Sequence, residues 1–249
     1  MATFKTRINK IANNKGKVIL ANDYSNSTRN LEAKTIKNIK TLNKFLCGIK
    51  FNFHLLLPLG FDQISKINKL AHKYDLQTIA DIKLNDISNT NKITLANLWK
   101  AGFDAVIVNP IMGSNALKKL VSLAHEKNKG IITLCHMSAP EAKLSYDMKV
   151  KLGNSKTPIP LYQLFLKSSL SNKVDGIIVG ATYPKIIKYC NKKSKGDLNI
   201  YSPGIGTQGG KIREVLHAGT NFLIVGRTIL NAKNPASTAE EFQKLSISK

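Results

Sequence analysis

Eight short runs of apolar, largely β-branched residues recur along the chain, and this repeat constrains the fold more than any other feature. Most runs begin between 23 and 31 residues after the previous one, the length of one strand and one helix with their connections. Strict alternation of strands and helices predicts a parallel sheet, and eight strands in 249 residues fit a closed (β/α)8 TIM barrel of the α/β class. The runs begin at Lys17, Leu46, Gln77, Asp104, Gly130, Asp175, Leu198 and Asn221.

The stretches between the runs carry apolar residues at helical spacing, as in residues 31–42, 64–71 and 117–124. No linker rich in proline, glycine or serine divides the chain, so we expect residues 1–249 to form one barrel domain. Residues 1–16 are expected to form either an extra N-terminal helix that closes the barrel bottom or a frayed tail. The segment from His136 to Pro160 is long for a connection, and it predicts a mobile loop that covers a substrate.

The composition indicates a globular protein with a strongly basic surface. No run approaches the roughly 20 apolar residues of a membrane span, and residues 1–16 lack a signal-peptide core, so we expect a cytoplasmic protein with no membrane partner.

Cys47, Cys135 and Cys190 are widely spaced, which argues against disulfides and a zinc site. The net charge is +23, but the lysines are spread over nearly every predicted helix without interleaved aromatic residues, which favours a solvated surface over nucleic-acid binding.

Charged residues at the ends of three consecutive predicted strands form the first candidate site. Asp23 follows the first strand, Lys50 lies in the second, and Asp81 and Lys83 end the third. Residues two apart in a strand share a face, and active sites of such barrels lie at the C-terminal strand ends, so these groups are expected to converge. Burying them costs free energy unless they pair or act in catalysis. Asp86 follows the strand end, so it need not share their direction and could serve a neighbouring subunit.

Two loops near the C-terminus form a candidate phosphate site. Ser202–Gly210 follows the seventh strand and is rich in glycine, and Val225–Thr228 follows the eighth. Glycine lets backbone N–H groups approach an anion closely, and the loops after strands seven and eight of this architecture commonly bind phosphate. Arg227 can hold two phosphate oxygens, and Gln208 can donate a hydrogen bond from its side chain.

His136 lies beside Cys135, but we do not interpret the two as a base and a nucleophile. Adjacent residues at a strand end point apart and no third group is evident, so His136 is expected to be a core or loop histidine. The five histidines show no ligand spacing such as H-x-x-x-H, and no metal site is predicted.

These motifs give the chain a resemblance to the orotidine 5′-monophosphate decarboxylases in their compact single-domain form, from Val18 to about Pro235. The resemblance is carried by Asp23, Lys50, Asp81-x-Lys83-x-x-Asp86-Ile87, Pro203–Gly210 and Gly226-Arg227. It implies that the protein decarboxylates orotidine 5′-monophosphate to uridine 5′-monophosphate in de novo pyrimidine biosynthesis. The reaction would need no cofactor, and Lys83 would donate the proton to C6 of the pyrimidine. It also implies a charged catalytic array, made of Lys50, Asp81, Lys83 and Asp86.

The resemblance further implies the substrate contacts and a homodimer. Asp23 and Lys50 would hold ribose hydroxyls, and Ser138 would bond the pyrimidine. The segment Met137-Ser-Ala-Pro-Glu141 keeps the serine and proline of the family's Met-Ser-His-Pro-Gly and lacks its histidine and glycine. Gln208, Gly226 and Arg227 would bind the phosphate, and the substrate contacts would also include Pro203 and Gly204. Asp86, Ile87 and Thr90 would reach into the partner's site.

Two alternatives remain. A magnesium-dependent hexulose-phosphate synthase or ketogulonate-phosphate decarboxylase would share the barrel and the Asp-x-Lys-x-x-Asp motif, but such enzymes have a metal-binding glutamate where this chain has Lys50, and a lysine cannot replace it. A basic nucleic-acid-binding barrel without catalysis is supported only by the charge, and it would bind with a steep dependence on salt.

Overall fold

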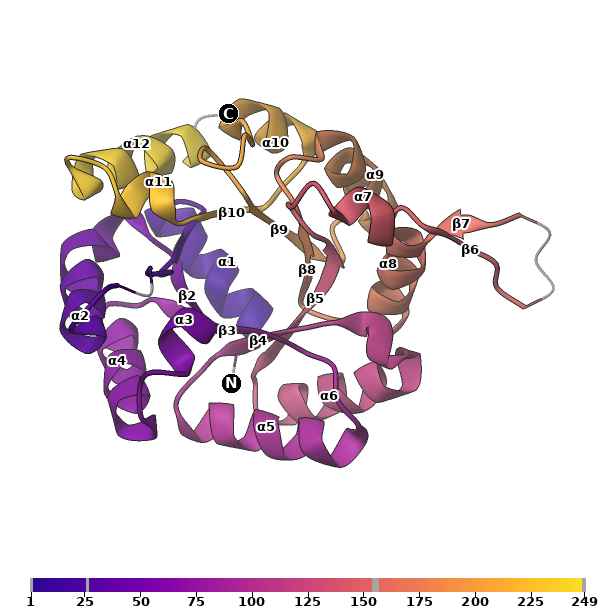
Figure 1. Cartoon of the computed structure of the whole chain (residues 1–249), viewed down its shortest axis with the longest axis horizontal. Coiled ribbons are helices and arrows are strands. Elements are labelled where there is room, and N and C mark those ends of the chain that lie inside the picture. The colour runs from indigo at the N-terminus through magenta and orange to yellow at the C-terminus, as the bar shows by residue number, and fades with distance from the viewer. Residues whose placement is uncertain (1, 26, 154–156, 248–249) are drawn as a thin grey trace.

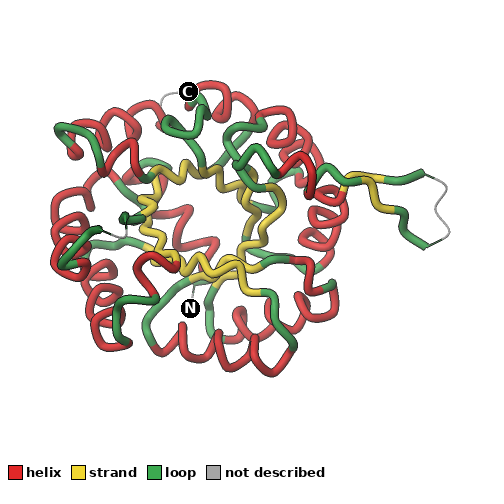
Figure 2. The backbone as a smooth tube through the Cα atoms, viewed as in Figure 1, coloured by secondary structure: helices red, strands yellow, loops and turns green. Residues whose placement is uncertain are grey.

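The computed structural model describes residues 2–25, 27–153 and 157–247, and its central feature is a closed barrel of parallel strands (Figure 1, Figure 2). The order around the barrel is β1-β10-β9-β8-β5-β4-β3-β2, and every neighbouring pair is parallel. The predicted (β/α)8 TIM barrel is therefore confirmed. Its strands are β1 (Val18–Ala21), β2 (Gly48–Asn52), β3 (Gln77–Leu84), β4 (Ala105–Val108), β5 (Gly130–His136), β8 (Gly176–Val179), β9 (Asn199–Pro203) and β10 (Phe222–Val225).

Helices surround the barrel on the outside (Figure 2). The apolar stripes predicted at residues 31–42, 64–71 and 117–124 lie in α2, α4 and α6, whose buried residues include Ile39, Ile67 and Leu117. The longer helices are α2 (Leu31–Leu42), α4 (Phe61–Lys73), α5 (Ser88–Lys100), α6 (Ser114–Glu126), α8 (Leu161–Ser171), α9 (Pro184–Ser194) and α12 (Pro235–Ile247). The shorter ones are α3 (Phe53–Leu56), α10 (Ile212–Ala218), α11 (Arg227–Leu230), and the 3-10 helices η1 (Asn43–Phe45) and η2 (Pro110–Met112).

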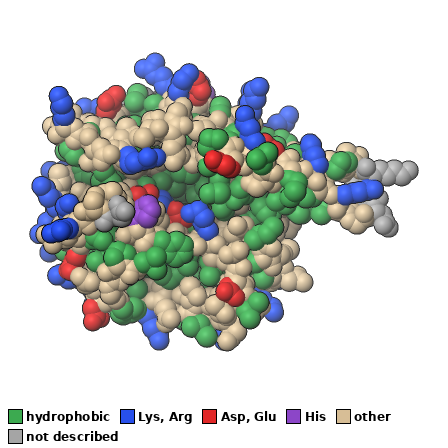
Figure 3. All heavy atoms as spheres, viewed as in Figure 1, with side chains coloured by type: hydrophobic (Ala, Val, Ile, Leu, Met, Phe, Trp, Pro, Cys, Tyr) green, Lys and Arg blue, Asp and Glu red, His purple; other side chains and the backbone are tan. Residues whose placement is uncertain are grey.

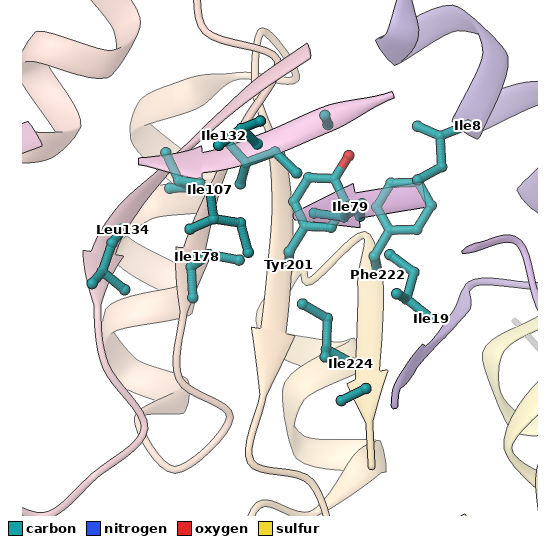
Figure 4. Packing of buried hydrophobic residues seen from close by; sticks show 14 of the residues in the cluster. Ile8, Ile19, Ile79, Ile107, Ile132, Leu134, Ile178, Tyr201, Phe222 and Ile224 are labelled. Carbon is teal, nitrogen blue, oxygen red and sulfur yellow. The ribbon is translucent and has the colours of Figure 1, made fainter. Parts of the chain in front are cut away.

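Side chains from the strands meet inside the barrel and form a packed floor, so that the barrel is not an open pore (Figure 4). The rings of Tyr201 and Phe222 stack with centroids 4.7 Å apart, and both residues are buried. Ile19 and Ile79 from β1 and β3 are also fully buried. Burying each such side chain stabilises the fold by about 1.5–3 kcal/mol. This floor leaves only the C-terminal strand ends open for a site.

The N-terminal segment forms α1 (Phe4–Lys15), which lies across one end of the barrel (Figure 1). Thr3 caps the helix by accepting a hydrogen bond from the Thr6 backbone, and Phe4 and Ile8 are fully buried. A side chain at Gly130 would collide with the Phe4 ring, so β5 begins with a glycine where the helix packs. Of the two possibilities for residues 1–16, the structure thus has the helix and not the frayed tail.

The segment after β5, predicted as a mobile loop that covers a substrate, contains regular secondary structure. It contains α7 (Ala142–Ser145) and a two-stranded antiparallel sheet of β6 (Lys149–Val150) and β7 (Ile159–Pro160). The sheet projects from the barrel (Figure 1), whereas Tyr146, just before β6 in the chain, is buried. Residues 154–156 of this segment lie outside the described part, and the mobility of the segment stays a prediction.

The face of the molecule that carries the C-terminal strand ends agrees with the expected distribution of charge. Figure 3 shows Lys and Arg side chains spread around the rim of one face, without a single basic stripe. The three cysteines are buried free thiols. Within residues 2–25, 27–153 and 157–247, we find no helix with the length and apolar character needed to cross a membrane.

Candidate active site

The C-terminal strand ends surround a cavity of about 1020 Å³. Its floor is apolar and is formed by Ile107, Leu134, Ile178 and Ile224. Figure 3 shows this face hollowed near its middle, where acidic and basic side chains lie next to one another. The predicted site residues that line the cavity are Asp23, Lys50, Asp81, Lys83, Ser138, Pro203, Gly204, Gln208, Gly226 and Arg227.

Asp81 and Lys83 are brought together by an irregular end of β3. Lys83 Nζ lies 2.8 Å from Asp81 Oδ1. The register of β3 against β4 shifts between Asp81 and Leu84, and Lys83 has a left-handed backbone with φ 47°. For a residue with a Cβ this conformation costs on the order of 1–3 kcal/mol. The two side chains therefore meet through a distorted strand end, not through the simple alternation that the sequence predicted.

Lys50 completes a chain of alternating charges. Its Nζ lies 2.8 Å from Asp81 Oδ2 and 3.6 Å from Asp23 Oδ1. Only 4% of Lys50 and 8% of Asp81 is exposed, so each charge has little water around it and depends on its partners. Both oxygens of Asp81 are thus occupied by ammonium groups that come from different strands.

The network fixes the protonation states of Asp81 and Lys50. Burial raises the pKa of Asp81, but the positive charges of Lys50 and Lys83 outweigh this effect and lower the pKa to about 2. Burial lowers the pKa of Lys50, but the negative charges of Asp81 and Asp23 outweigh it and raise that pKa above its ordinary value. At neutral pH the cavity therefore presents an ionised Asp81 and a protonated Lys50.

Asp23 has a buried carboxylate oxygen that lacks a hydrogen-bond donor among the described residues. Its Oδ1 is buried, and it accepts no hydrogen bond from the described residues. Its nearest charged group, Lys50 Nζ, is too far away at 3.6 Å for a good hydrogen bond. A buried acceptor without a donor costs free energy, so this oxygen is suited to accept a hydrogen bond from a hydroxyl group of a ligand.

Glycines shape the loops after β9 and β10. Gly204 and Gly206 have φ of 93° and 74°, and a Cβ on Gly204 would lie 2.7 Å from Gln208 Oε1. The Thr228 hydroxyl donates to the Ile205 carbonyl and accepts from the Thr207 backbone, which ties the two loops together. The exposed Gln208 and Arg227 side chains line the cavity at this end, so they are free to meet an anion.

Ser138 follows β5 and lies close to the loop after β9. Its carbonyl accepts a hydrogen bond from Thr182 Oγ1 at 2.9 Å. Gly180 allows this approach, because a Cβ there would lie 2.5 Å from the Ser138 Cα. Ser138 is half-buried, and its side chain is held close to Gly204.

Three predicted site residues, Asp86, Ile87 and Thr90, do not line this cavity. Asp86 Oδ1 accepts a hydrogen bond from the Ile87 backbone, and Asn91 holds the Asp86 backbone. Asp86 and Ile87 line a second, separate depression, and Ile87 is 73% exposed. Within one chain the structure therefore assembles three members of the predicted catalytic array and not the fourth, because the chain turns away after Leu84.

Several lining residues were not predicted. Asn52 lies two residues after Lys50 on β2, so strand alternation alone could have found it. Tyr24, in the loop after β1, also lines the cavity, but no motif marked it. Asn38 and His54 line it as well, and they could not be predicted because α2 and α3 reach the mouth only in the folded chain.

His136 and Cys135 behave as expected for core residues. His136 is fully buried beside the Tyr183 ring, and Cys135 Sγ donates to the Tyr162 carbonyl. Burial lowers the pKa of His136. In the described part of the chain, no cluster of three or more His, Cys, Asp or Glu side chains is arranged to hold a metal ion.

Fold and site together define a (β/α)8-barrel enzyme with a buried lysine–aspartate array and glycine-rich loops suited to a phosphate. Residues 16–242 match the model of the orotidine 5′-phosphate decarboxylase / HUMPS family. The chain belongs to this family, which confirms the resemblance seen in the sequence.

Named relatives narrow the comparison. The chain is 35% identical to the orotidine 5′-phosphate decarboxylase of Pyrococcus abyssi over 84% of this chain and 91% of the relative, and 31% identical to that of Methanosarcina mazei over 84% and 87%. Its fold is similar to the crystal structure of the Pyrococcus horikoshii enzyme, with a TM-score of 0.76, 30% identity, and coverage of 93% of this chain and all of the other. The crystal structure of the Methanocaldococcus jannaschii enzyme complexed with the inhibitor BMP gives a TM-score of 0.78 at 27% identity. The match covers 93% of this chain and 99% of the other. These relatives support a carboxy-lyase of pyrimidine biosynthesis.

Proposed function

We propose that this chain converts orotidine 5′-monophosphate to uridine 5′-monophosphate, without a metal or organic cofactor, through the charged array at its barrel mouth. The observation that carries the proposal is that Lys50 and Lys83 each place an ammonium group 2.8 Å from a different oxygen of Asp81, inside a cavity large enough for a nucleotide. The family and its named relatives support the same reaction.

Lys83 is the proton donor. The bond between C6 and the carboxylate breaks, carbon dioxide leaves, and the electron pair stays on C6, where the ring cannot readily delocalise it. The Lys83 ammonium stabilises this developing charge and then transfers a proton to C6. Lys83 is the less buried of the two lysines, with 40% of its side chain exposed, so solvent can reprotonate the amine.

Asp81 acts through its fixed negative charge. Its low pKa keeps it ionised near the substrate carboxylate. At an effective dielectric of 20, two unit charges 4 Å apart repel by about 4 kcal/mol, and this repulsion is relieved when carbon dioxide leaves. Asp81 also holds both lysines in place through its two short contacts.

The other lining residues bind the parts of the nucleotide that do not react. Asp23 and Lys50 hold ribose hydroxyls, and the unpaired Asp23 Oδ1 supports this role. Ser138 bonds the pyrimidine. Arg227, with Gln208, Pro203, Gly204 and Gly226, binds the phosphate at the glycine-rich end of the cavity. Because the phosphate lies away from C6, its binding energy can serve loop closure and the rate as well as affinity.

The active form is a cytoplasmic homodimer in which Asp86, Ile87 and Thr90 enter the partner's site. The exposure of Ile87 supports this proposal, since an apolar side chain that is 73% exposed and lines a depression together with Asp86 suits an interface. Asp86 would then complete the catalytic array from the other subunit. The basic surface remains solvated and binds no nucleic acid.

The reaction is tested by incubating the protein with orotidine 5′-monophosphate and a chelator, and following the loss of the substrate's ultraviolet absorbance. Turnover that persists under chelation supports the proposal. Turnover that requires magnesium, or that occurs only with a sugar phosphate, would favour the hexulose-phosphate synthase branch. If the protein turns over neither substrate and binds RNA with a steep dependence on salt, the nucleic-acid alternative would be favoured.

A further inference from the structure

The carboxylate of Asp23 is not held by close contacts of its own. Among the described residues its only charged neighbour is Lys50, at 3.6 Å, and its Oδ1 has no hydrogen-bond donor. Asp23 follows β1, beyond the last residue that pairs with β10. Its position must therefore be determined by the backbone on either side of it.

Both neighbours of Asp23 are tied to α2. The Asn22 amide donates to Thr35 Oγ1 at 2.9 Å and accepts from the Asn38 amide at 2.9 Å. The Tyr24 hydroxyl accepts from the same Asn38 amide at 2.9 Å. Asn38 thus bridges the residue before Asp23 and the residue after it.

This bridge uses the full donor capacity of Asn38. Its NH₂ group has two hydrogens, and the two acceptors are Asn22 Oδ1 and Tyr24 OH. Asn22 and Thr35 are fully buried, so their hydrogen bonds do not compete with water and are costly to lose. The backbone N–H of Asn22 also donates to the Lys50 carbonyl, which fixes the bridged segment against β2.

We propose that Asn38 is a positioning residue. Through Asn22 and Tyr24 it holds the Asp23 carboxylate at the place where this carboxylate accepts a hydrogen bond from a ribose hydroxyl. This inference rests on the proposed function, in which Asp23 binds that hydroxyl. Asn38 lines the cavity, but both of its amide hydrogens are engaged in the bridge, so neither is left to donate to a ligand.

The test compares orotidine 5′-monophosphate with its 2′-deoxy and 3′-deoxy analogues in a double-variant cycle. The analogue of interest is the one whose penalty in the wild type disappears in Asp23→Ala. For Asn38→Ala we expect kcat/KM on the full substrate to fall about tenfold, with a much smaller fall on that analogue. Combining Asn38→Ala with Asp23→Ala is expected to give no further loss.

Asn43→Ala is the matched control. Asn43 lies at the C-terminal end of the same helix and donates to the carbonyls of Ile39 and Lys40, so its loss weakens α2 without touching the segment around Asp23. In this control, the ratio of kcat/KM for the full substrate to kcat/KM for the deoxy analogue should keep its wild-type value. If Asn38→Ala does not fold, Tyr24→Phe removes one arm of the bridge, keeps the ring, and should shift the same ratio.

Two results would overturn the inference. One is an equal loss on both substrates in Asn38→Ala, or in Tyr24→Phe where that variant replaces it, since this is what a purely structural role predicts. The other is multiplicative losses in the double variant. Both require an active wild type, so they differ from failure of the proposed function, in which the wild type itself does not consume orotidine 5′-monophosphate.

Discussion

Lys83 Nζ lies 2.8 Å from Asp81 Oδ1, although these residues are only two positions apart and the Lys83 backbone is left-handed with φ 47°. Lys50 occupies the other oxygen of Asp81 at the same distance. One carboxylate therefore separates two ammonium groups that would otherwise repel each other. Strained backbone of this kind is characteristic of functional sites, where the surrounding structure holds a conformation that the residue would not adopt alone.

Removing the charge of Asp81 should destabilise the protein. In Asp81→Asn the buried Lys50 keeps only the distant Asp23 as its counter-charge, and we expect the free energy of unfolding at pH 7 to fall by about 3–5 kcal/mol. Urea denaturation measures this change. Asp197→Asn, on an exposed turn, is the control and should change stability by less than about 0.5 kcal/mol.

The same variant should alter the response to acid. The pKa of Asp81 is lowered to about 2, so the stability it contributes is present above the unfolded pKa of about 3.9 and is lost as pH falls through 2. The stability gap between wild type and Asp81→Asn should therefore narrow below about pH 4. A gap of constant size from pH 7 to pH 2.5 would contradict the low pKa.

His125 should give the opposite dependence on pH. A hydrogen bond from Nε2 to Asp175 Oδ2, 3.1 Å long, raises the pKa of His125. Its contribution is fully present below the unfolded pKa of about 6.5 and is lost as pH rises through the folded value. His125→Gln should therefore cost more stability at pH 5 than at pH 8.5 in thermal unfolding. A loss of stability of equal size at both pH values would contradict the raised pKa of His125.

Arg227 should matter for the phosphate. In Arg227→Ala we expect kcat/KM for orotidine 5′-monophosphate to fall about 100-fold, because a charged hydrogen-bond partner of the phosphate is lost. Orotidine without the phosphate should be turned over equally by both proteins. Arg213→Ala, an exposed arginine on α10, is the control and should behave as the wild type. A similar loss on both substrates in Arg227→Ala would argue against phosphate binding.

Ile87 should lie in a subunit interface. Ile87→Asp is expected to convert dimer to monomer in sedimentation velocity, because a charge in a buried apolar interface is costly. Activity should fall with it, since Asp86 would no longer reach the partner's site. Leu144→Asp introduces the same charge at an 84% exposed leucine on α7 and should leave the dimer intact. A monomeric wild type with full activity would refute this prediction.

Much of the fold follows from the sequence for a simple reason. Buried parallel strands must be apolar on both faces, so β1, β4 and β10 are marked by their composition alone. The charges of Lys50 and Asp81 interrupt such strands, and the barrel places all strand ends at one edge. Those two facts predicted the centre of the site.

Other parts depend on contacts that a sequence does not display. The left-handed backbone at Lys83 could not be predicted, because lysine gives no signal for that conformation. The bridge from Asn38 to Asn22 and Tyr24 exists only once α2 packs beside β1. The sheet of β6 and β7 has two short strands, and Pro140, Pro158 and Pro160 in this segment suggested a loop.

The central claim is that Lys83 supplies the proton to C6, and single-turnover decarboxylation by Lys83→Ala tests it most directly. With enzyme in excess over orotidine 5′-monophosphate, we expect the rate constant to fall at least about 10⁴-fold, while binding of uridine 5′-monophosphate is retained. Lys188→Ala, an exposed lysine on α9, controls for the lost charge. A Lys83→Ala rate within tenfold of the wild type would contradict the account.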